Sequence, residues 1–186
     1  MDKPLWAPWR IEYVLGKRRD HGCVFCGVAT MSAEQRTERL VLASTPTAFV
    51  VLNRFPFTAG HLLVVPHAHV ENLEDLSPAD HDALFRLVRA SVTRLRAGVK
   101  ADGFNVGLNL GAVAGAGIAA HLHVHVVPRW AGDTNFMPVL GDVRVIPQAL
   151  EATRDYLAGF FADVEGLREP RHGAEPAAAD DVEAAR

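Results

Sequence analysis

The chain has 186 residues, of which 49% are hydrophobic, 22% charged and 8% aromatic, and this ordinary globular composition and length favour one domain with a sizeable core. The formal net charge of −3 gives no basic field that would gather a nucleic acid polymer. No apolar run is long enough to span a bilayer, so a membrane partner is not expected.

The N-terminal segment, residues 1–22, is expected to be an arm whose aromatic residues Trp6 and Trp9 dock elsewhere. It lacks the apolar region of a signal peptide, so we expect a cytoplasmic protein. Cys23 and Cys26, the only cysteines, then form a Cys-x-x-Cys pair in a reducing compartment. That spacing indicates metal or redox chemistry rather than a structural disulfide, and two small buried side chains are the alternative.

Short β-branched runs follow. Residues 31–39 are polar and predict a loop, whereas residues 40–43 and 48–52 flank Ser44-Thr45-Pro46 and predict a hairpin. Asn53-Arg54-Phe55-Pro56 is a turn signal, and residues 60–66 predict a central strand.

Helical patterns and further strands complete the domain. Ser77 as N-cap, Pro78 in the first turn and Asp80 three residues after the cap predict a helix start. Apolar residues at spacings of three and four continue this helix to Val99, and a second helical stripe runs over residues 146–164. Residues 104–110 and 122–127 predict strands, separated by a Gly/Ala loop at 111–117. The order predicts an α+β fold, a mainly antiparallel sheet carrying one long and one C-terminal helix.

The domain is expected to span residues 23–164, and residues 165–186 are expected to be a disordered tail rich in alanine and acidic residues. The tail has too few apolar residues to offset its ordering entropy. It holds six of the 22 acids and three of the 19 bases, which leaves 16 of each sign, so the body is formally neutral.

The segment His121-Leu122-His123-Val124-His125-Val126-Val127 alternates between histidine and apolar residues. In a strand, residues two apart share a face, so three imidazoles should project to one side. A solvent-exposed face and a purely structural metal site are the simpler interpretations. The catalytic interpretation uses an imidazole that is neutral and nucleophilic near pH 7, beside a glycine loop whose N–H groups stabilise phosphate charge. We favour the catalytic interpretation.

This segment resembles the motif of the histidine triad family, His-φ-His-φ-His-φ-φ with φ apolar, and every position matches. The resemblance extends from about Cys23 to Trp130, through residues 48–53, 60–66 and 108–111. Residues 128–130 and 132–136 are most similar to bacterial members that hydrolyse or phosphorolyse diadenosine tetraphosphate.

The resemblance implies a fold, a reaction and a set of site residues. His123 would attack an α-phosphorus to form a nucleotidyl-histidine intermediate, which water or phosphate then releases. His125 would contact the phosphate and leaving group, Asn109 the reacting phosphate, and Asn53 the ribose. A nearby carbonyl oxygen would hold the His123 ring in its nucleophilic tautomer.

Two positions distinguish this chain within the wider family. Related uridylyltransferases have glutamine in place of His125, so a histidine there favours a hydrolase or phosphorylase. Many members carry a hydroxyl residue shortly before the triad as a phosphate ligand, whereas residues 115–120 here offer only glycine, alanine and isoleucine. Backbone N–H groups around Gly115 and Gly117 must then supply that contact.

A metal site is also implied. Zinc sites need four ligands, and two thiols must be completed by histidines. In zinc-binding members the remaining ligands lie at the positions of His69 and His121, which gives the set Cys23, Cys26, His69 and His121. Four protein ligands leave no open position for a catalytic water, so we expect a structural zinc. His67 is expected to be a bystander.

The remaining candidates are weaker. His61 has two interpretations, a satisfied core histidine or a group that supports the triad, and we favour the second. Trp130 is expected to pack rather than stack on a base, and the other histidines are expected at the surface: His21, His81 and His172. Members of the family usually form homodimers through a shared sheet, so a homodimer is expected.

The leading functional hypothesis is therefore an enzyme that cleaves dinucleoside polyphosphates. A nucleoside phosphoramidase would use the same His123 chemistry on a P–N bond. A zinc-stabilised nucleotide-binding module without turnover is the alternative from another class. The base, the phosphate chain length and the choice between water and phosphate are left open by the sequence.

Overall fold

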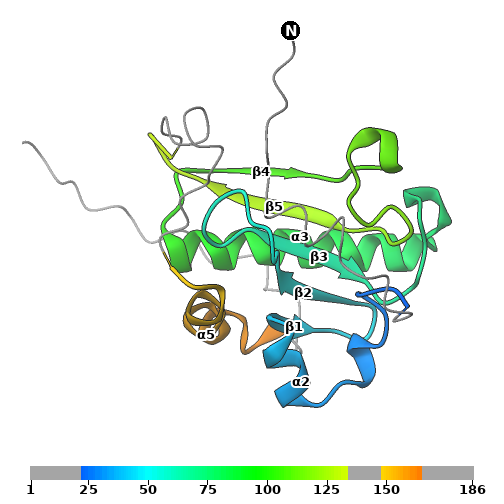
Figure 1. The fold of residues 1–186 in the computed structure, drawn as a ribbon, viewed down its shortest axis with the longest axis horizontal. Helices are drawn as coiled ribbons and strands as arrows, with labels where there is room; N and C mark the ends of the chain where they lie inside the picture. The colour runs from blue at the N-terminus through cyan, green and yellow to red at the C-terminus, as the bar shows by residue number, and fades with distance from the viewer. Residues whose placement is uncertain (1–21, 134–147, 165–186) are drawn as a thin grey trace, which may run out of the picture.

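The computed structural model describes residues 22–133 and 148–164 (Figure 1). The predictions for residues 1–21, for Ile146 at the start of the second helical stripe, and for the tail at 165–186 lie outside the described residues. Among the described helices, none has the length and apolar composition needed to cross a membrane.

The fold is α+β, as predicted. Five antiparallel strands form one sheet in the order β1-β2-β3-β5-β4, namely β1 Val41–Ser44, β2 Ala48–Leu52, β3 Leu62–Pro66, β5 Val124–Arg129 and β4 Gly103–Gly107. The long helix α3 (Pro78–Val99) crosses one face of the sheet, and α5 (Leu150–Phe161) packs against α3 and β1 (Figure 1). Short helices are η1 (Val28–Thr30), α2 (Ala33–Glu38), η2 (Leu73–Asp75) and η3 (Ala112–Ala114).

Local sequence explains the start and end of α3. The Ser77 hydroxyl oxygen accepts from the N–H of Asp80 at 3.1 Å, which satisfies one of the free N–H groups of the first turn. The last helical residue is Val99, and the next residue, Lys100, adopts φ 49° as the C-cap. Leu84, Leu87 and Leu95 are each at most 2% exposed, so the predicted apolar stripe is the buried one.

The register of the sheet decides which side chains face α3. Phe104 pairs with Pro128, and the guanidinium carbon of Arg96 on α3 lies 5.0 Å from the centre of the Phe104 ring. The row of Phe104, Pro128 and Val126 therefore faces the helix. Because side chains alternate along a strand, His125, which lies next to Val126 in β5, points to the opposite face of the sheet.

Several element predictions were wrong in part, and the central strand expected over residues 60–66 begins at Leu62. Residues 33–38 form α2 rather than loop, because Ser32 and Gln35 make a capping box. The strand expected over 104–110 ends at Gly107.

The strand expected to begin at Leu122 begins at Val124 instead. The carbonyl of His121 accepts from the His123 ring, and the N–H of Leu122 donates to Val70 O at 2.7 Å. One local bond and one bond to a distant segment thus hold residues 121–123 in place of sheet pairing.

Candidate functional site

The three triad histidines divide between two neighbouring groups. The ring centres of His123 and His125 lie 5.1 Å apart, whereas the His121 ring lies 5.0 Å from that of His69. His123 and His125 therefore form a pair, and His121 lies with the potential metal ligands, as the family resemblance implies. His121 is fully buried and His123 is 6% exposed.

His123 is held in one tautomer. Its Nδ1 lies 2.8 Å from the carbonyl oxygen of His121, and because a carbonyl only accepts, Nδ1 carries the hydrogen. Nε2 then has the lone pair. The family resemblance implies a carbonyl contact of this kind, and the attack by His123 stays a prediction.

His125 is held in the complementary tautomer by two bonds in series. The N–H of Phe57 donates to His61 Nδ1 at 3.1 Å, so the hydrogen of the neutral His61 ring is on Nε2. That Nε2–H donates to His125 Nδ1 at 2.9 Å. The neutral His125 ring consequently carries its hydrogen on Nε2, where it is a donor.

Burial favours this neutral state. Burial, together with the smaller effect of the neighbouring His123, lowers the pKa of His125 to about 4. At neutral pH the ring is uncharged and donates from one nitrogen only. His123 and His125 together therefore present an acceptor and a donor, respectively.

His61 is fully buried and is part of this site. Its ring stacks on Phe57 at 5.1 Å between centres and 15° between planes. The amide nitrogen of Asn53 lies 3.4 Å from His61 Nδ1, while Asn53 Oδ1 accepts from the N–H of Phe55 at 2.9 Å. Asn53 thus lies beside the His61–His125 pair, and its ribose contact stays a prediction.

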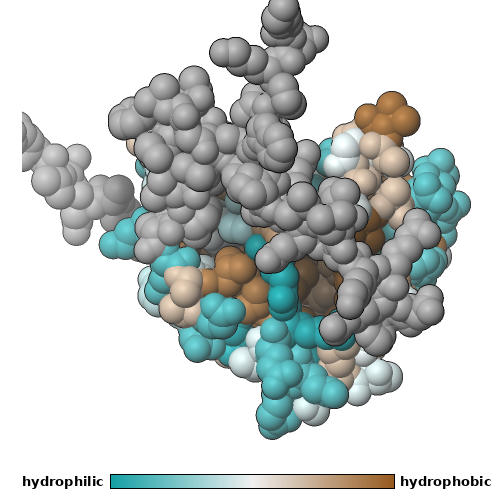
Figure 2. Space-filling model, viewed as in Figure 1, coloured by the Kyte–Doolittle hydropathy of each residue, from teal (hydrophilic) through white to brown (hydrophobic). Residues whose placement is uncertain are grey.

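The glycine loop is folded on itself. Gly115 adopts φ 90° and its N–H donates to Ala112 O at 3.0 Å, so this N–H is satisfied within the loop rather than directed at a ligand. Asn109 donates to Gly115 O at 3.5 Å. Val113 at the tip is fully exposed, and Figure 2 shows apolar surface on this projecting loop at the upper right. The phosphate contacts of Asn109, Gly115 and Gly117 stay predictions.

Four potential metal ligands form the second cluster. Ligand atoms of Cys23, Cys26, His69 and His121 all lie within 4.8 Å of one another. Cys23 Sγ is 3.2 Å from His121 Nδ1, and Cys26 Sγ is 3.2 Å from His69 Nδ1. His121 Nε2–H donates to Pro66 O at 2.9 Å, which leaves Nδ1 with its lone pair toward the thiols. The group can bind a metal ion.

The remaining described histidines, His67 and His81, lie outside both clusters. His67 stacks on Phe49 and its Nε2–H donates to Thr45 O at 3.0 Å, outside the metal-binding group. His81 is partly exposed on α3. Trp130 packs, with Nε1–H donating to Val99 O at 3.3 Å. His21 and His172 lie outside the described residues.

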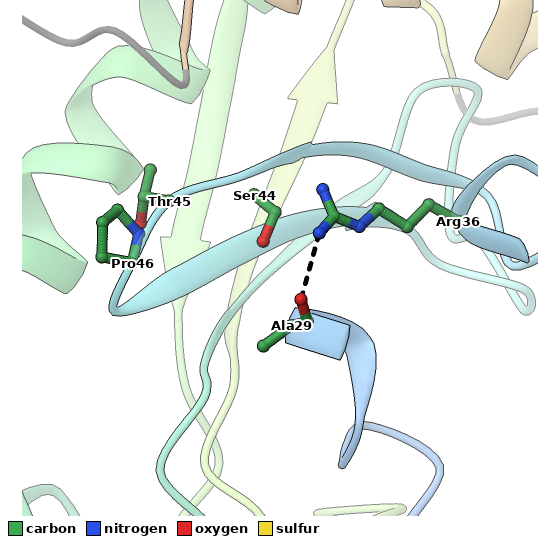
Figure 3. A pocket seen from close by; sticks show the side chains of 5 residues that line it. All are labelled: Ala29, Arg36, Ser44, Thr45 and Pro46. Carbon is green, nitrogen blue, oxygen red and sulfur yellow. Dashed lines mark hydrogen bonds between the residues drawn. The ribbon is translucent and has the colours of Figure 1, made fainter. Parts of the chain in front are cut away.

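A surface pocket of about 330 Å³ lies apart from the histidine pair (Figure 3). It is lined by Ala29, Arg36, Ser44, Thr45 and Pro46, and Arg36 closes one side by donating to Ala29 O at 3.2 Å. None of these lining residues is one of the predicted site residues.

Two contributions to the site were missed by sequence reasoning. Phe57 fixes the His61 tautomer through its backbone N–H and covers the ring with its side chain. Phe25 packs against both His121 and His123. Neither contact has a sequence signal, because a backbone donor and an apolar ring look like ordinary loop and core residues.

Known proteins share much of this chain's sequence. The HIT domain model matches residues 34–132. The chain is 41% identical over 166 residues to a protein of Mycobacterium tuberculosis named AP-4-A phosphorylase, covering 85% of this chain and 84% of that one. It is 33% identical over 93 residues to the asymmetrical bis(5'-nucleosyl)-tetraphosphatase of Schizosaccharomyces pombe, covering 50% of each.

Solved structures show the same fold. A zinc-bound histidine triad family protein from Mycobacterium smegmatis superposes with a TM-score of 0.56 at 29% identity, covering 69% of this chain and 87% of that one. A histidine triad nucleotide-binding protein from Sulfolobus tokodaii gives a TM-score of 0.61 at 24% identity, covering 76% and 93%.

Proposed function

Because this chain belongs to the histidine triad family, we propose that it cleaves dinucleoside polyphosphates such as diadenosine tetraphosphate through a nucleotidyl-histidine intermediate on His123. The observation that carries the proposal is the tautomer of His123. Its Nδ1–H is engaged by His121 O at 2.8 Å, which leaves the Nε2 lone pair for attack.

In the first step, His123 Nε2 attacks the α-phosphorus, and a P–N bond forms as the bond from phosphorus to the bridging oxygen breaks. The attacking His123 ring becomes cationic, and the His121 carbonyl stabilises that charge through the Nδ1–H bond. With diadenosine tetraphosphate the leaving group is adenosine triphosphate, and the intermediate is adenylyl-His123.

His125 supports this step as a donor. Its Nε2–H is directed by the His61 bond, and in our proposal it donates to the bridging oxygen as negative charge develops there. Asn109 and the N–H groups of the loop containing Gly115 and Gly117 are proposed to bind the phosphate oxygens, and Asn53 the ribose. For Gly115 this requires its N–H to leave Ala112 O.

In the second step an acceptor attacks the adenylyl phosphorus and the P–N bond breaks. We favour inorganic phosphate, which gives adenosine diphosphate. The relative named AP-4-A phosphorylase aligns over 85% of this chain, whereas the relative named tetraphosphatase aligns over 50%. Water as acceptor would give adenosine monophosphate.

The metal-binding group is proposed to hold zinc. Zinc bond lengths of about 2.0–2.3 Å at tetrahedral angles place ligand atoms about 3.3–3.8 Å apart. The His121 Nδ1 atom lies 3.2 Å from Cys23 Sγ and 3.8 Å from Cys26 Sγ, which is close to this range. A relative of similar fold is zinc-bound. With four protein ligands the ion would stabilise the loop at Cys23–Cys26 and leave bond making to His123.

We also propose a homodimer formed through β4. This strand lies at the edge of the sheet, beside β5, and its Val106 side chain is 47% exposed. An edge strand offers unpaired backbone groups to a second chain. Light scattering on the purified protein measures the mass directly, and a monomer would refute this part of the proposal.

Product analysis tests the reaction. The chain is incubated with diadenosine tetraphosphate, with and without inorganic phosphate, and nucleotides are separated by chromatography. Equal amounts of adenosine triphosphate and diphosphate that require phosphate support phosphorolysis; triphosphate and monophosphate indicate hydrolysis. If no nucleotide is released from diadenosine tetraphosphate but a nucleoside phosphoramidate is cleaved, the result would favour a phosphoramidase. Binding of the nucleotide without turnover would favour a nucleotide-binding module.

A further inference from the structure

Phe25 connects the thiol pair to the nucleophile. It lies between Cys23 and Cys26 in the sequence and is 8% exposed. Its ring centre is 5.4 Å from that of His121, at 79° between planes, and 5.5 Å from that of His123, at 53°. One side chain of the metal-binding loop therefore contacts both a potential metal ligand and the attacking ring.

The backbone of Phe25 is tied to the same cluster. Its N–H donates to Cys23 Sγ at 3.4 Å, and its ring also packs edge-on against Phe49 of the core at 6.2 Å. The position of the ring thus follows the position of the thiols. A change in the positions of Cys23 and Cys26 would therefore move the Phe25 ring, against which His123 packs.

The His123 ring needs that surface. Its hydrogen bond to His121 O restrains one edge of the ring, but a single bond leaves the ring free to tilt about it. The tilt is restricted by the neighbouring rings, Phe25 at 5.5 Å and His125 at 5.1 Å. In-line attack by Nε2 requires a defined ring plane, because misplacement by about 1 Å costs about 100-fold in rate.

We propose that Phe25 is a positioning residue for the His123 ring, through which the cluster of Cys23, Cys26, His69 and His121 controls the rate of attack at phosphorus. The inference rests on the proposed function for its effect on rate, but its structural part, the orientation of the His123 ring, does not.

A double-mutant cycle in the full-length chain tests the rate. The variants are Phe25→Ala, Cys26→Ala and the two combined, with Val24→Ala as the matched control. Val24 lies in the same loop and is 56% exposed, so its truncation removes a side chain between the thiols without touching the histidine rings. The readout is the single-turnover rate of adenosine triphosphate release from saturating diadenosine tetraphosphate.

We expect Phe25→Ala and Cys26→Ala each to lower this rate about 10- to 100-fold, with KM changed less than about threefold. The combined variant should be no slower than the slower single variant, because both changes release the same ring. Val24→Ala should match the parent chain. Rate losses that multiply in the combined variant would overturn the coupling, as would a folded Phe25→Ala protein with the parent rate.

Nitrogen-15 NMR of the histidine rings gives a readout independent of turnover. The parent chain should show the His123 resonances of one ordered ring, and Phe25→Ala should show shifted and broadened His123 resonances, because the ring can then tilt about its bond to His121 O. Phe25→Leu, which refills most of the volume but has no aromatic ring to pack against His123, should shift these resonances by an intermediate amount and keeps the test available if the alanine variant does not fold. If the chain has no cleavage activity, the proposed function fails, but the orientation of the His123 ring is still measured. Unchanged His123 resonances in both folded variants would overturn the proposed positioning role of Phe25.

Discussion

His61 fixes the direction in which His125 donates, and two amide substitutions separate this role from simple core filling. The asparagine amide places its polar atoms where the imidazole Nδ1 lies, so His61→Asn keeps an acceptor for the N–H of Phe57 but cannot reach His125. The glutamine amide extends to the position of Nε2, so His61→Gln retains a donor toward His125 Nδ1. Both variants place an amide at the same fully buried position.

The magnitude follows from the lost hydrogen bond. In His61→Asn the 2.9 Å bond to His125 Nδ1 is absent, and a buried acceptor left unpaired costs about 1–3 kcal/mol. His125 escapes that cost by changing tautomer or rotating, and either change withdraws the Nε2–H from the leaving group. At about 1.4 kcal/mol per factor of ten, kcat should fall about 5- to 150-fold. His61→Gln should stay within about fivefold of the parent chain.

The assay is steady-state formation of adenosine triphosphate from diadenosine tetraphosphate, on variants first compared by circular dichroism and thermal unfolding. Two outcomes contradict the reasoning: equal losses in the asparagine and glutamine variants, or a folded His61→Asn protein with the parent kcat. Either would mean that His61 only fills space beneath His125.

Three further results are expected. The pKa of His125 is lowered to about 4 in the folded chain against about 6.5 when unfolded, so the unfolded state binds more protons between these values and stability falls as pH drops from about 6.5 to 4. The urea midpoint of the parent chain should therefore fall more steeply over this pH range than that of His125→Gln. Parallel curves for the two proteins would contradict the assigned pKa of His125. Elemental analysis should find one zinc ion per chain in the parent protein and in the His67→Ala control, but little zinc in His69→Ala. The His69→Ala protein should also have a lower melting temperature. Zinc retained in His69→Ala would exclude His69 as a ligand. Ser77→Ala should lower the free energy of unfolding by about 1 kcal/mol in urea titrations without changing kcat, because the hydroxyl's bonds to the N–H and the carboxylate of Asp80 at the start of α3 are lost. An unchanged free energy of unfolding would show that this cap adds nothing to stability.

The sequence predicted the elements whose signals are local. Ser77, Pro78 and Asp80 located the start of α3, and the turn residues at 44–46 located the first hairpin. The capping box of Ser32 and Gln35 was also present in the sequence, but the polar residues around it favoured a loop.

What the sequence did not predict depends on contacts between distant segments. The alternation of His121, His123 and His125 predicted a strand from residue 122, but it could not show that the N–H of Leu122 bonds to the distant Val70 O before β5 begins at Val124. The bond from His61 to His125 joins residues 64 apart in the sequence. The packing of Phe25 on His123 likewise depends on how the thiol loop folds back over the sheet.

The most direct test of the proposed mechanism is to trap the covalent intermediate. The chain is mixed with diadenosine tetraphosphate in the absence of inorganic phosphate, quenched in alkali to preserve the P–N bond, digested and analysed by mass spectrometry. The account predicts an adenylyl group on the peptide containing residues 121–127, located on His123 and absent from a folded His123→Ala protein. Rapid substrate cleavage with no adduct, or an adduct on His125 instead, would contradict it.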